Sequence, residues 1–579
     1  MRILKGIPAS SGIAAGKVFL YEHETLEVPH EQYTDDERAA KEIARFSDAM
    51  TTVRDDLKRL DQTTLDGEQN DILQTHLMML EDPEFDSGVR SYITSSKVNA
   101  EWAVEVIAGQ FVKALESTAD PMLRERSVDL KDVSLRIMSM LMSINRVSLS
   151  SLTEDVVLVS DGLLPTEVLS MDRSHILGIA LNGSGRTSHV AILARSFNIP
   201  TVVGLGAVTK KVRTGDEIIV DGNHGEVVVR PEWSTAQSLR DRYDKWIAHE
   251  EELRDVAALP SETTDGHAVI LKANVEMLDE LDAVLHNGGE GIGLYRSEFL
   301  FMRPGGLASE EEQFNAYRKV IEGVQGKGPV TIRTIDVGGD KVIPGIGIDE
   351  ENPILGWRAV RFCLSRKDIF RVQLRALLRA SAYGELRIMF PMISGIEELE
   401  GVLLILEQVK DECRKAHIPF DENLKVGTMI EVPSAALCAD ILAKRVDFFS
   451  IGTNDLIQYT IAVDRGNEKI AYLYQPFHPG VLRFIQMIID KGHEAGIPVG
   501  MCGEMAGDAM SAVLLTGLGL DEFSMSPQSL LEVRKIIRGV SFPEAQALAK
   551  RVMRMDSYLK INSYIREWMH ERFDYFTSV

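Results

Sequence analysis

The chain has 579 residues, of which 45% are hydrophobic and 26% charged, and its formal net charge is −24. Such a composition is typical of a folded protein, and the length indicates about four domains, or fewer if one is a barrel of about 250 residues. The negative charge disfavours nucleic acid as a partner; it suits a basic protein partner, or it only keeps a large protein in solution.

The N-terminal sequence has no uninterrupted apolar core of the signal-peptide type. No later stretch reaches the roughly 18 charge-free apolar residues that cross a bilayer, so we expect no membrane insertion. The four cysteines, Cys363, Cys413, Cys438 and Cys502, have neither metal-binding spacing nor the density of a disulfide scaffold. A reduced, cytoplasmic location is therefore expected.

Residues 1–22 have the pattern of short β segments with Gly and Ser turns. Apolar residues from Ile43 to Leu60 then recur at steps of three and four, which predicts an amphipathic helix. Further helical patterns cover Asn70–Leu80, Glu101–Leu115 and Asp129–Ile144. We therefore expect a helical domain, residues 24–145, inserted after the first strands.

Short β-branched runs follow the helical segment and indicate strands. They cover residues 156–160, 176–181, 201–204, 217–221 and 226–230. We expect them to join the N-terminal strands in one α/β domain, formed by residues 1–23 plus 146–231. A helical pattern from Trp233 to Ala258, followed by Pro260, predicts a linker over residues 232–260.

Eight strand-like runs alternate with helical stretches in the second half of the chain. They cover residues 268–274, 291–295, 330–335, 386–392, 426–431, 447–452, 498–502 and 522–525. This alternation predicts a (β/α)8 barrel of the TIM type over residues 261–579. The fold class is therefore multidomain α/β.

Polar side chains gather where these predicted strands end, and active sites of such barrels form at the carboxyl ends of the strands. The residues are Asn274, Arg296, Arg333, Glu431, Asn454, Asp455 and Cys502. Two cations, two carboxamides, two carboxylates and a thiol on one rim indicate a functional site rather than a merely solvated surface.

Residues 183–195, GSGRTSHVAILAR, combine a Gly-containing turn with a helix start. Thr187 or Ser188 is a good N-cap, which places His189 in the first helical turn. Free backbone N–H groups there stabilise an anion such as a phosphorylated imidazole. The alternative is a histidine that only caps or packs, but the turn and the barrel rim favour the functional interpretation.

The chain resembles the phosphoenolpyruvate–protein phosphotransferases, the enzyme I family of the bacterial sugar phosphotransferase system, essentially from end to end. The residues that carry the resemblance are GIPASSGIAAGK, LRERSVDLKDV, GRTSHVAILAR, GIGLYRSEFLFM, IRTIDVGGDK, ENPILGWRAVR, IEVPSAAL, FSIGTNDLIQYTIAVDRGN, HPGVL and GMCGEMAGD. The resemblance implies a swivelling phosphohistidine domain, a helical domain that docks the carrier protein HPr, and a homodimer through the barrel.

The resemblance also implies a role for each residue that matches a motif. His189 would carry the phosphoryl group of phosphoenolpyruvate, and Cys502 would protonate the product. The substrate-binding residues would be Arg296, Arg333, Glu431, Asn454, Asp455 and Arg465. Glu431 and Asp455 would also bind Mg²⁺, although two carboxylates do not distinguish Mg²⁺ from Mn²⁺.

Two alternatives remain open from the sequence. A pyruvate phosphate dikinase or phosphoenolpyruvate synthase shares the histidine segment and barrel, but only 188 residues precede His189 here, without a visible Gly-rich nucleotide loop. A non-catalytic regulatory relative would not need the complete residue set. The family usually has Gly-Gly where this chain has Ser184-Gly185, and the absence of a preceding sensory domain favours the sugar-system form.

Overall fold

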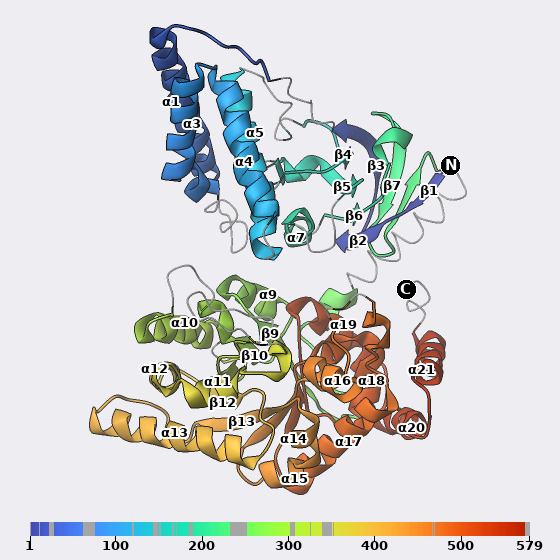
Figure 1. The fold of residues 1–579 in the computed structure, drawn as a ribbon. Coiled ribbons are helices and arrows are strands. Elements are labelled where there is room, and N and C mark those ends of the chain that lie inside the picture. Colours follow the sequence, from blue (N-terminus) through green and yellow to red (C-terminus); the bar gives the residue numbers. More distant parts are fainter. Residues whose placement is uncertain are drawn as a thin grey trace. The chain divides into compact units, whose positions relative to one another are not determined.

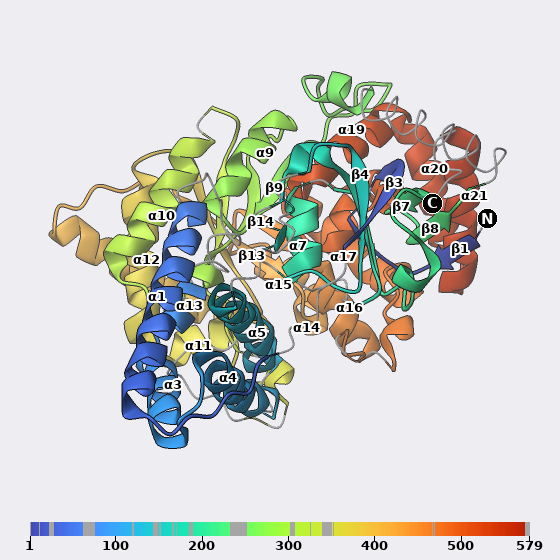
Figure 2. The same ribbon diagram turned by 90° about the horizontal axis from the view of Figure 1, so that it is seen from above.

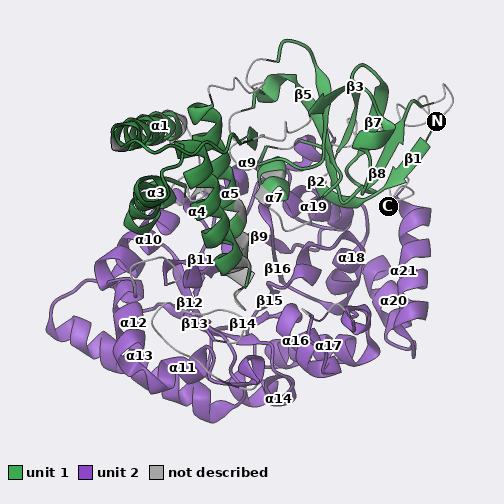
Figure 3. Ribbon diagram, turned by 45° about the horizontal axis from the view of Figure 1, so that its top comes forward, with its two compact units in different colours: residues 1–247, 579 green, residues 248–578 purple. Residues whose placement is uncertain are grey.

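The computed structural model divides the chain into two compact units, residues 1–247 with 579 and residues 248–578 (Figure 3). It describes residues 2–10, 12–21, 28–61, 76–117, 121–142, 149, 152–164, 167–168, 171–183, 189–197, 199–231, 252–301, 307–324, 326–338, 350, 352–465, 467 and 469–573. Among these residues, no helix has the length and apolar character needed to cross a membrane.

The first unit contains an eight-stranded mixed sheet in the order β1-β8-β7-β3-β4-β5-β6-β2. Its strands are β1 Arg2–Lys5, β2 Ile7–Ser10, β3 Ile13–Tyr21, β4 Val156–Ser160, β5 Ile176–Leu181, β6 Thr201–Val203, β7 Glu217–Asp221 and β8 Glu226–Val229. β3 and β4 are parallel neighbours although more than 130 residues separate them in sequence. The chain between them is therefore an insertion into one α/β domain, which confirms the predicted architecture.

The inserted segment forms a helical bundle (Figures 1 and 2). Its described helices are α1 Asp36–Asp61, α3 Pro83–Ser96, α4 Ala100–Glu116 and α5 Pro121–Leu141. Phe46, Val53 and Leu57 of α1 are buried in its core, as their spacing predicts.

One helix of this bundle, α3, was not predicted. The carboxylate of Asp82 caps its first turn, Pro83 occupies the first helical position, and Phe85, Val89 and Ile93 face the core. An Asp-Pro pair is typical of a turn as well as of a helix start, and the spacing of four between these apolar residues was therefore overlooked. α5 also begins earlier than the predicted residue 129. Residues 70–75 and most of the predicted linker helix lie outside the described residues.

The second unit is a closed barrel of eight parallel strands, as predicted. The strands are β9 Ile270–Val275, β10 Ile292–Arg296, β11 Val330–Arg333, β12 Leu386–Phe390, β13 Lys425–Ile430, β14 Phe448–Ile451, β15 Val499–Met501 and β16 Glu522–Met525. Each strand pairs with the next, and β16 pairs with β9 to close the barrel. All carboxyl ends therefore lie at one rim.

Helices follow most of the strands and bury the apolar faces of the barrel. They are α9 Leu281–His286, α10 Glu310–Gly323, α11 Val360–Ser365, α12 Lys367–Ser381, α13 Ile396–Lys415, α14 Pro433–Leu437, α15 Ala439–Leu442, α16 Thr453–Ile461, α17 Pro479–Glu494, α18 Ala509–Leu518, α19 Leu530–Arg538, α20 Phe542–Val552 and α21 Tyr558–Arg572. Local sequence sets their ends: Ser309 and Glu312 form a capping box on α10, and Gly519 adopts a φ of 91° after α18.

An ion cluster inside the barrel joins the two strands that close it. Lys272 of β9 is fully buried, and its Nζ lies 2.6 Å from Oε2 of Glu522 on β16. Arg387 of β12 donates to the other oxygen of Glu522 at 3.1 Å. Buried charges are retained only when paired, so this cluster fixes the closing strands beneath the rim.

Candidate active site

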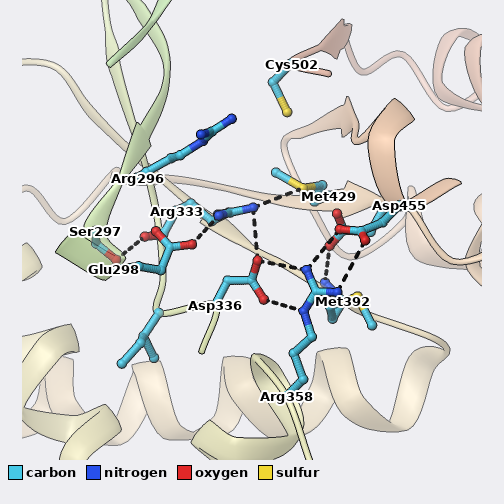
Figure 4. Close-up of polar contacts among 12 residues, drawn as sticks. Arg296, Ser297, Glu298, Arg333, Asp336, Arg358, Met392, Met429, Asp455 and Cys502 are labelled. Carbon is cyan, nitrogen blue, oxygen red and sulfur yellow. Dashed lines mark hydrogen bonds and ion pairs between the residues drawn. The ribbon is translucent and has the colours of Figure 1, made fainter. Parts of the chain in front are cut away.

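The residues predicted at the strand ends do come together at one rim of the barrel. Figure 4 labels Arg296, Arg333, Asp455 and Cys502 among them. Arg296 and Arg333 are the last residues of the adjacent strands β10 and β11, where they are register partners. Glu431 directly follows β13 and Cys502 directly follows β15. Asn454 and Asp455 lie in the first turn of α16, after β14. This geometry follows from the parallel barrel.

A chain of alternating charges crosses the site (Figure 4). Buried Arg333 contacts the carboxylate of Glu298 through Nη2, and its Nη1 lies 3.3 Å from Asp336. Arg358 lies between two carboxylates, with Nε 2.9 Å from Asp336 Oδ1 and Nη2 3.0 Å from Asp455 Oδ2. Five side chains thus form one network, Glu298–Arg333–Asp336–Arg358–Asp455.

These contacts keep both buried arginines charged. Burial alone would lower the pKa of Arg333, but the carboxylates of Glu298 and Asp336 outweigh it and raise the pKa. Asp336 and Asp455 outweigh burial in the same way and raise the pKa of Arg358. Since each charge faces an opposite one at short range, removal of a member takes away part of the compensation of the buried charges that remain.

Arg296 has a different environment. It contacts the carboxylate of Glu276, and its side chain is 36% exposed at the mouth of the barrel. Burial of its guanidinium lowers the pKa of Arg296, and the positive charges of Arg333 and Arg465 add to this effect. Neighbouring positive charges of this kind create a place for an anion. Arg465 itself is exposed in the turn after α16.

The environment of Glu431 suits a cation. Its side chain is buried, and Oε1 accepts a hydrogen bond from the N–H of Met392 at 2.6 Å. Burial, followed by the negative charges of Asp455 and Asp336, raises the pKa of Glu431 to about 8. A divalent cation between Glu431 and Asp455 would relieve this repulsion. No group of three or more His, Cys, Asp or Glu side chains in the described residues forms a metal centre, so the remaining ligands would be substrate oxygens and water.

Gly452 leaves the space that the Glu431 carboxylate occupies. A Cβ on residue 452 would lie 2.7 Å from Glu431 Oε2 and 2.9 Å from Met429 Sδ, closer than van der Waals contact allows. We expect Gly452→Ala to displace Glu431 and to weaken Mn²⁺ binding by about 10- to 100-fold, the loss typical of disturbed ligand orientation. Titration calorimetry measures the Mn²⁺ affinity of the variant and of the unmodified chain.

The matched control is Gly395→Ala on the same rim. A Cβ there meets only the end of the Glu397 side chain, at 3.3 Å, which is free to move away. Its Mn²⁺ affinity should equal that of the unmodified chain. Equal affinities for the Gly452 and Gly395 variants would contradict the role of Glu431.

Asn454 is held by its neighbours in a fixed orientation. Its Nδ2 donates to Glu504 Oε1 and its Oδ1 accepts from the N–H of Glu504, both at 3.1 Å. The hydroxyl of Tyr474 donates to the backbone carbonyl of Asn454 at 3.2 Å. Glu504 therefore positions this carboxamide at the rim.

Cys502 borders a cavity of about 320 Å³ that Arg296, Glu504 and residues after β9 and β16 also line. Asn274 of β9 donates from Nδ2 to the Cys502 carbonyl at 2.9 Å, and Ser524 donates to Asn274 Oδ1 at 2.6 Å. Burial raises the pKa of the Cys502 thiol. Cys502 is therefore a protonated thiol at neutral pH, with its backbone fixed from two strands.

His189 is the first residue of α7, His189–Ser196, which follows β5 in the sheet of the first unit. Its place at a helix start agrees with the sequence prediction. The predicted caps Thr187 and Ser188, and the Ser184-Gly185 pair, lie outside the described residues. The site residues on the barrel and His189 thus belong to separate units.

Three members of the charge network, Glu298, Asp336 and Arg358, were not predicted as site residues. The signal for them was present, because each lies within a motif that carries the family resemblance. His478, which lies in the HPGVL motif, has a structural contact: its Nδ1 accepts a hydrogen bond from the N–H of Gly480 in the first turn of α17. Cys363 and Cys413 are buried, and Cys438 is partly buried.

Comparison with known proteins shows the family of the chain. Residues 250–542 match the family model of the PEP-utilising enzyme, PEP-binding domain. Residues 5–126 match the N-terminal part of the PEP-utilising enzymes, and residues 152–225 match their mobile domain. The phosphoenolpyruvate-protein phosphotransferase of Bacillus subtilis is 42% identical over 98% of this chain and 100% of its own length. This chain belongs to the phosphoenolpyruvate-protein phosphotransferase family.

Other relatives extend this result. The phosphoenolpyruvate-protein phosphotransferase of Haemophilus influenzae is 43% identical over 98% of this chain and 99% of its own length. A solution structure of an Enzyme I protein is 38% identical and covers 42% of this chain and 99% of its own, with a TM-score of 0.38, too low to carry an argument about the fold. Membership of the phosphotransferase family thus rests on nearly complete sequence coverage.

Proposed function

We propose that this chain transfers the phosphoryl group of phosphoenolpyruvate to His189 and then to a histidine of the carrier protein HPr, releasing pyruvate, as the first step of the sugar phosphotransferase system. The main supporting observation is the pair of neighbouring guanidinium groups, Arg296 and Arg333, at a rim that also holds two carboxylates and a buried thiol. Within the described part of the chain, the buried Nε of Arg333 has no hydrogen-bond partner, as expected of a donor that awaits an anion.

Arg296 and Arg333 would bind the phosphate, because guanidinium groups keep their charge and donate in a planar fork. Phosphoryl transfer has a loose transition state with charge spread over the equatorial oxygens, which such donors stabilise. Asn454, fixed by Glu504, and Arg465 would bind the remaining substrate oxygens. Glu298 and Asp336 contact Arg333 and orient its guanidinium before substrate binds.

Glu431 and Asp455 would hold a divalent metal ion, Mg²⁺ or Mn²⁺, together with substrate oxygens. When bound, such an ion neutralises charge that develops on the phosphate and enolate oxygens. The chain's own contribution is to fix the orientation of each carboxylate, through the Met392 N–H on Glu431 and the Arg358 guanidinium on Asp455.

Cys502 would complete the reaction as the acid. The bond between phosphorus and the enol oxygen breaks while phosphorus bonds to a nitrogen of His189, which leaves the enolate of pyruvate. A proton from the thiol to the methylene carbon gives pyruvate, and the thiolate regains a proton from solvent. The raised pKa of Cys502 keeps this thiol protonated at neutral pH.

We expect Cys502→Ala to slow pyruvate formation by about 10² to 10⁴, the usual contribution of a positioned acid. The measurement follows the exchange of pyruvate methyl protons in D₂O by NMR, in the presence of the phosphorylated protein. Cys413→Ala, which changes a buried cysteine in α13, is the control and should exchange like the unmodified chain. Normal exchange in Cys502→Ala would contradict the assignment.

Further parts of the proposal concern organisation. The domains would be residues 1–23 plus 146–231, the inserted 24–145 that docks HPr, the linker 232–260 and the barrel 261–579. The N-terminal half would swing between phosphoenolpyruvate and HPr, the barrel would mediate a homodimer, and the protein would act in the cytoplasm.

A dikinase or synthase is less well supported, because the reported relatives match over nearly their full length under the phosphotransferase name.

The test is incubation of the chain with ³²P-labelled phosphoenolpyruvate and Mg²⁺, followed by peptide mapping. We expect an acid-labile label on the peptide that contains His189, release of an equal amount of pyruvate, and loss of the label on addition of HPr. A properly folded chain that takes up no label would overturn the proposal.

A further inference from the structure

Arg358 donates a hydrogen bond to each carboxylate oxygen of Asp455. Its Nη1 donates to Oδ1 at 3.2 Å and its Nη2 donates to Oδ2 at 3.0 Å. The same guanidinium also binds Asp336, with Nε 2.9 Å from Oδ1 and Nη2 3.1 Å from Oδ2. One cation is therefore held between two carboxylates, in the bidentate geometry that arginine favours.

The two ends of this arrangement differ in accessibility. The Asp336 side chain is fully buried and also contacts Arg333, whereas that of Asp455 is 15% exposed. Arg358 is thus anchored from the interior by Asp336, and Asp455 is the partner that a second cation is able to reach.

We propose that Arg358 is a built-in counterion of Asp455 that competes with the divalent cation and thereby sets the metal affinity of the site. This inference rests on the proposed function, in which Glu431 and Asp455 hold the metal. An ion at Asp455 must share its oxygens with the guanidinium and is repelled by its positive charge, and this repulsion is poorly screened at a buried site.

The counterion also has a structural consequence. Asp336 and Glu431 are buried with Asp455 beside them, and carboxylates so placed repel one another. Arg358 supplies positive charge to this group in the folded chain and offsets the repulsion among these carboxylates. The same charge then makes metal binding weaker than the carboxylates of Glu431 and Asp455 alone would make it.

The test measures Mn²⁺ binding to the full chain without phosphoenolpyruvate, from the electron paramagnetic resonance signal of free Mn²⁺. Arg358→Gln should bind Mn²⁺ at least about tenfold more tightly than the unmodified chain, because repulsion and competition are both removed. Arg366→Gln is the matched control: it removes the same charge from a surface pair with Asp368 and should leave the affinity unchanged. Asp455→Asn should lose the binding, which locates the measured ion.

Unchanged or weaker Mn²⁺ binding in Arg358→Gln would overturn the inference, and so would unchanged binding in Asp455→Asn. If Arg358→Gln does not fold, the Mn²⁺ affinity of Arg358→Lys is measured instead. Lysine keeps the charge but lacks the fork that binds two carboxylates, so a smaller tightening is expected and no tightening would refute the idea. Since no phosphoenolpyruvate is present, this outcome is independent of the labelling experiment.

Discussion

Replacement of His189 with alanine is expected to abolish phosphorylation by phosphoenolpyruvate. The acceptor must be a nucleophile that is neutral near pH 7, and an unperturbed imidazole has a pKa of about 6.5. The start of α7 carries the positive end of the helix dipole, which stabilises the negative charge of a phosphorylated ring. Alanine keeps the helix but offers no nucleophile, so the label should fall below detection.

His175→Ala is the matched control for this prediction. His175 belongs to the same sheet domain, and its Nδ1 lies 2.9 Å from Asp155. The variant removes an imidazole from the same domain and should be labelled like the unmodified chain. Acid-labile label that remains in His189→Ala and disappears in His175→Ala would reverse the assignment.

The second large effect is expected at Arg333. Arg333→Gln removes a buried cation whose Nη1 and Nη2 contact Asp336 and Glu298. Loss of an arginine that stabilises a phosphoryl transition state lowers kcat/KM by about 10³ to 10⁵. Arg333→Lys keeps the charge without the planar fork, so we expect it to recover only part of this loss. Pyruvate release, coupled to an indicator reaction, gives the rates.

Arg333→Gln should also destabilise the barrel, because it removes the guanidinium that pairs with the buried carboxylates of Glu298 and Asp336. Breaking a buried pair costs about 3 to 5 kcal/mol, measured as the unfolding free energy of the barrel in urea. Arg318→Gln removes a partly exposed partner of Glu322 and should cost much less stability, with normal activity. Activity of Arg333→Gln within tenfold of the unmodified chain would exclude a direct role in phosphate binding.

The network also explains how the site is prepared for its substrate. Arg333 is oriented by Glu298 and Asp336, Asp455 by Arg358, and the Cys502 backbone by Asn274. Preorganised charges of this kind need little rearrangement during reaction. The proposed counterion role of Arg358 adds that the same contacts tune the metal affinity, so orientation and affinity depend on one guanidinium.

The sequence by itself determined the local features of this protein. Eight apolar runs predicted the barrel strands, because strands covered on both faces are apolar along their length. The helical spacing predicted α1, and the N-cap candidates Thr187 and Ser188 after a Gly-containing turn predicted the helix start at His189. Because parallel strands end at one rim, the positions of Arg296, Arg333, Glu431 and Cys502 in these patterns were sufficient to gather them into one predicted site.

Only the tertiary structure decided which side chains pair. Arg358 precedes α11 and Asp455 lies in α16, so no local spacing indicates that they meet, and the same holds for Glu298 and Arg333 on neighbouring strand ends. The adjacency of β3 and β4 likewise depends on long-range pairing across the inserted bundle. Sequence periodicity indicates the face of a helix or strand on which a side chain lies. Its contact partners are determined by packing and by the need to neutralise every buried charge.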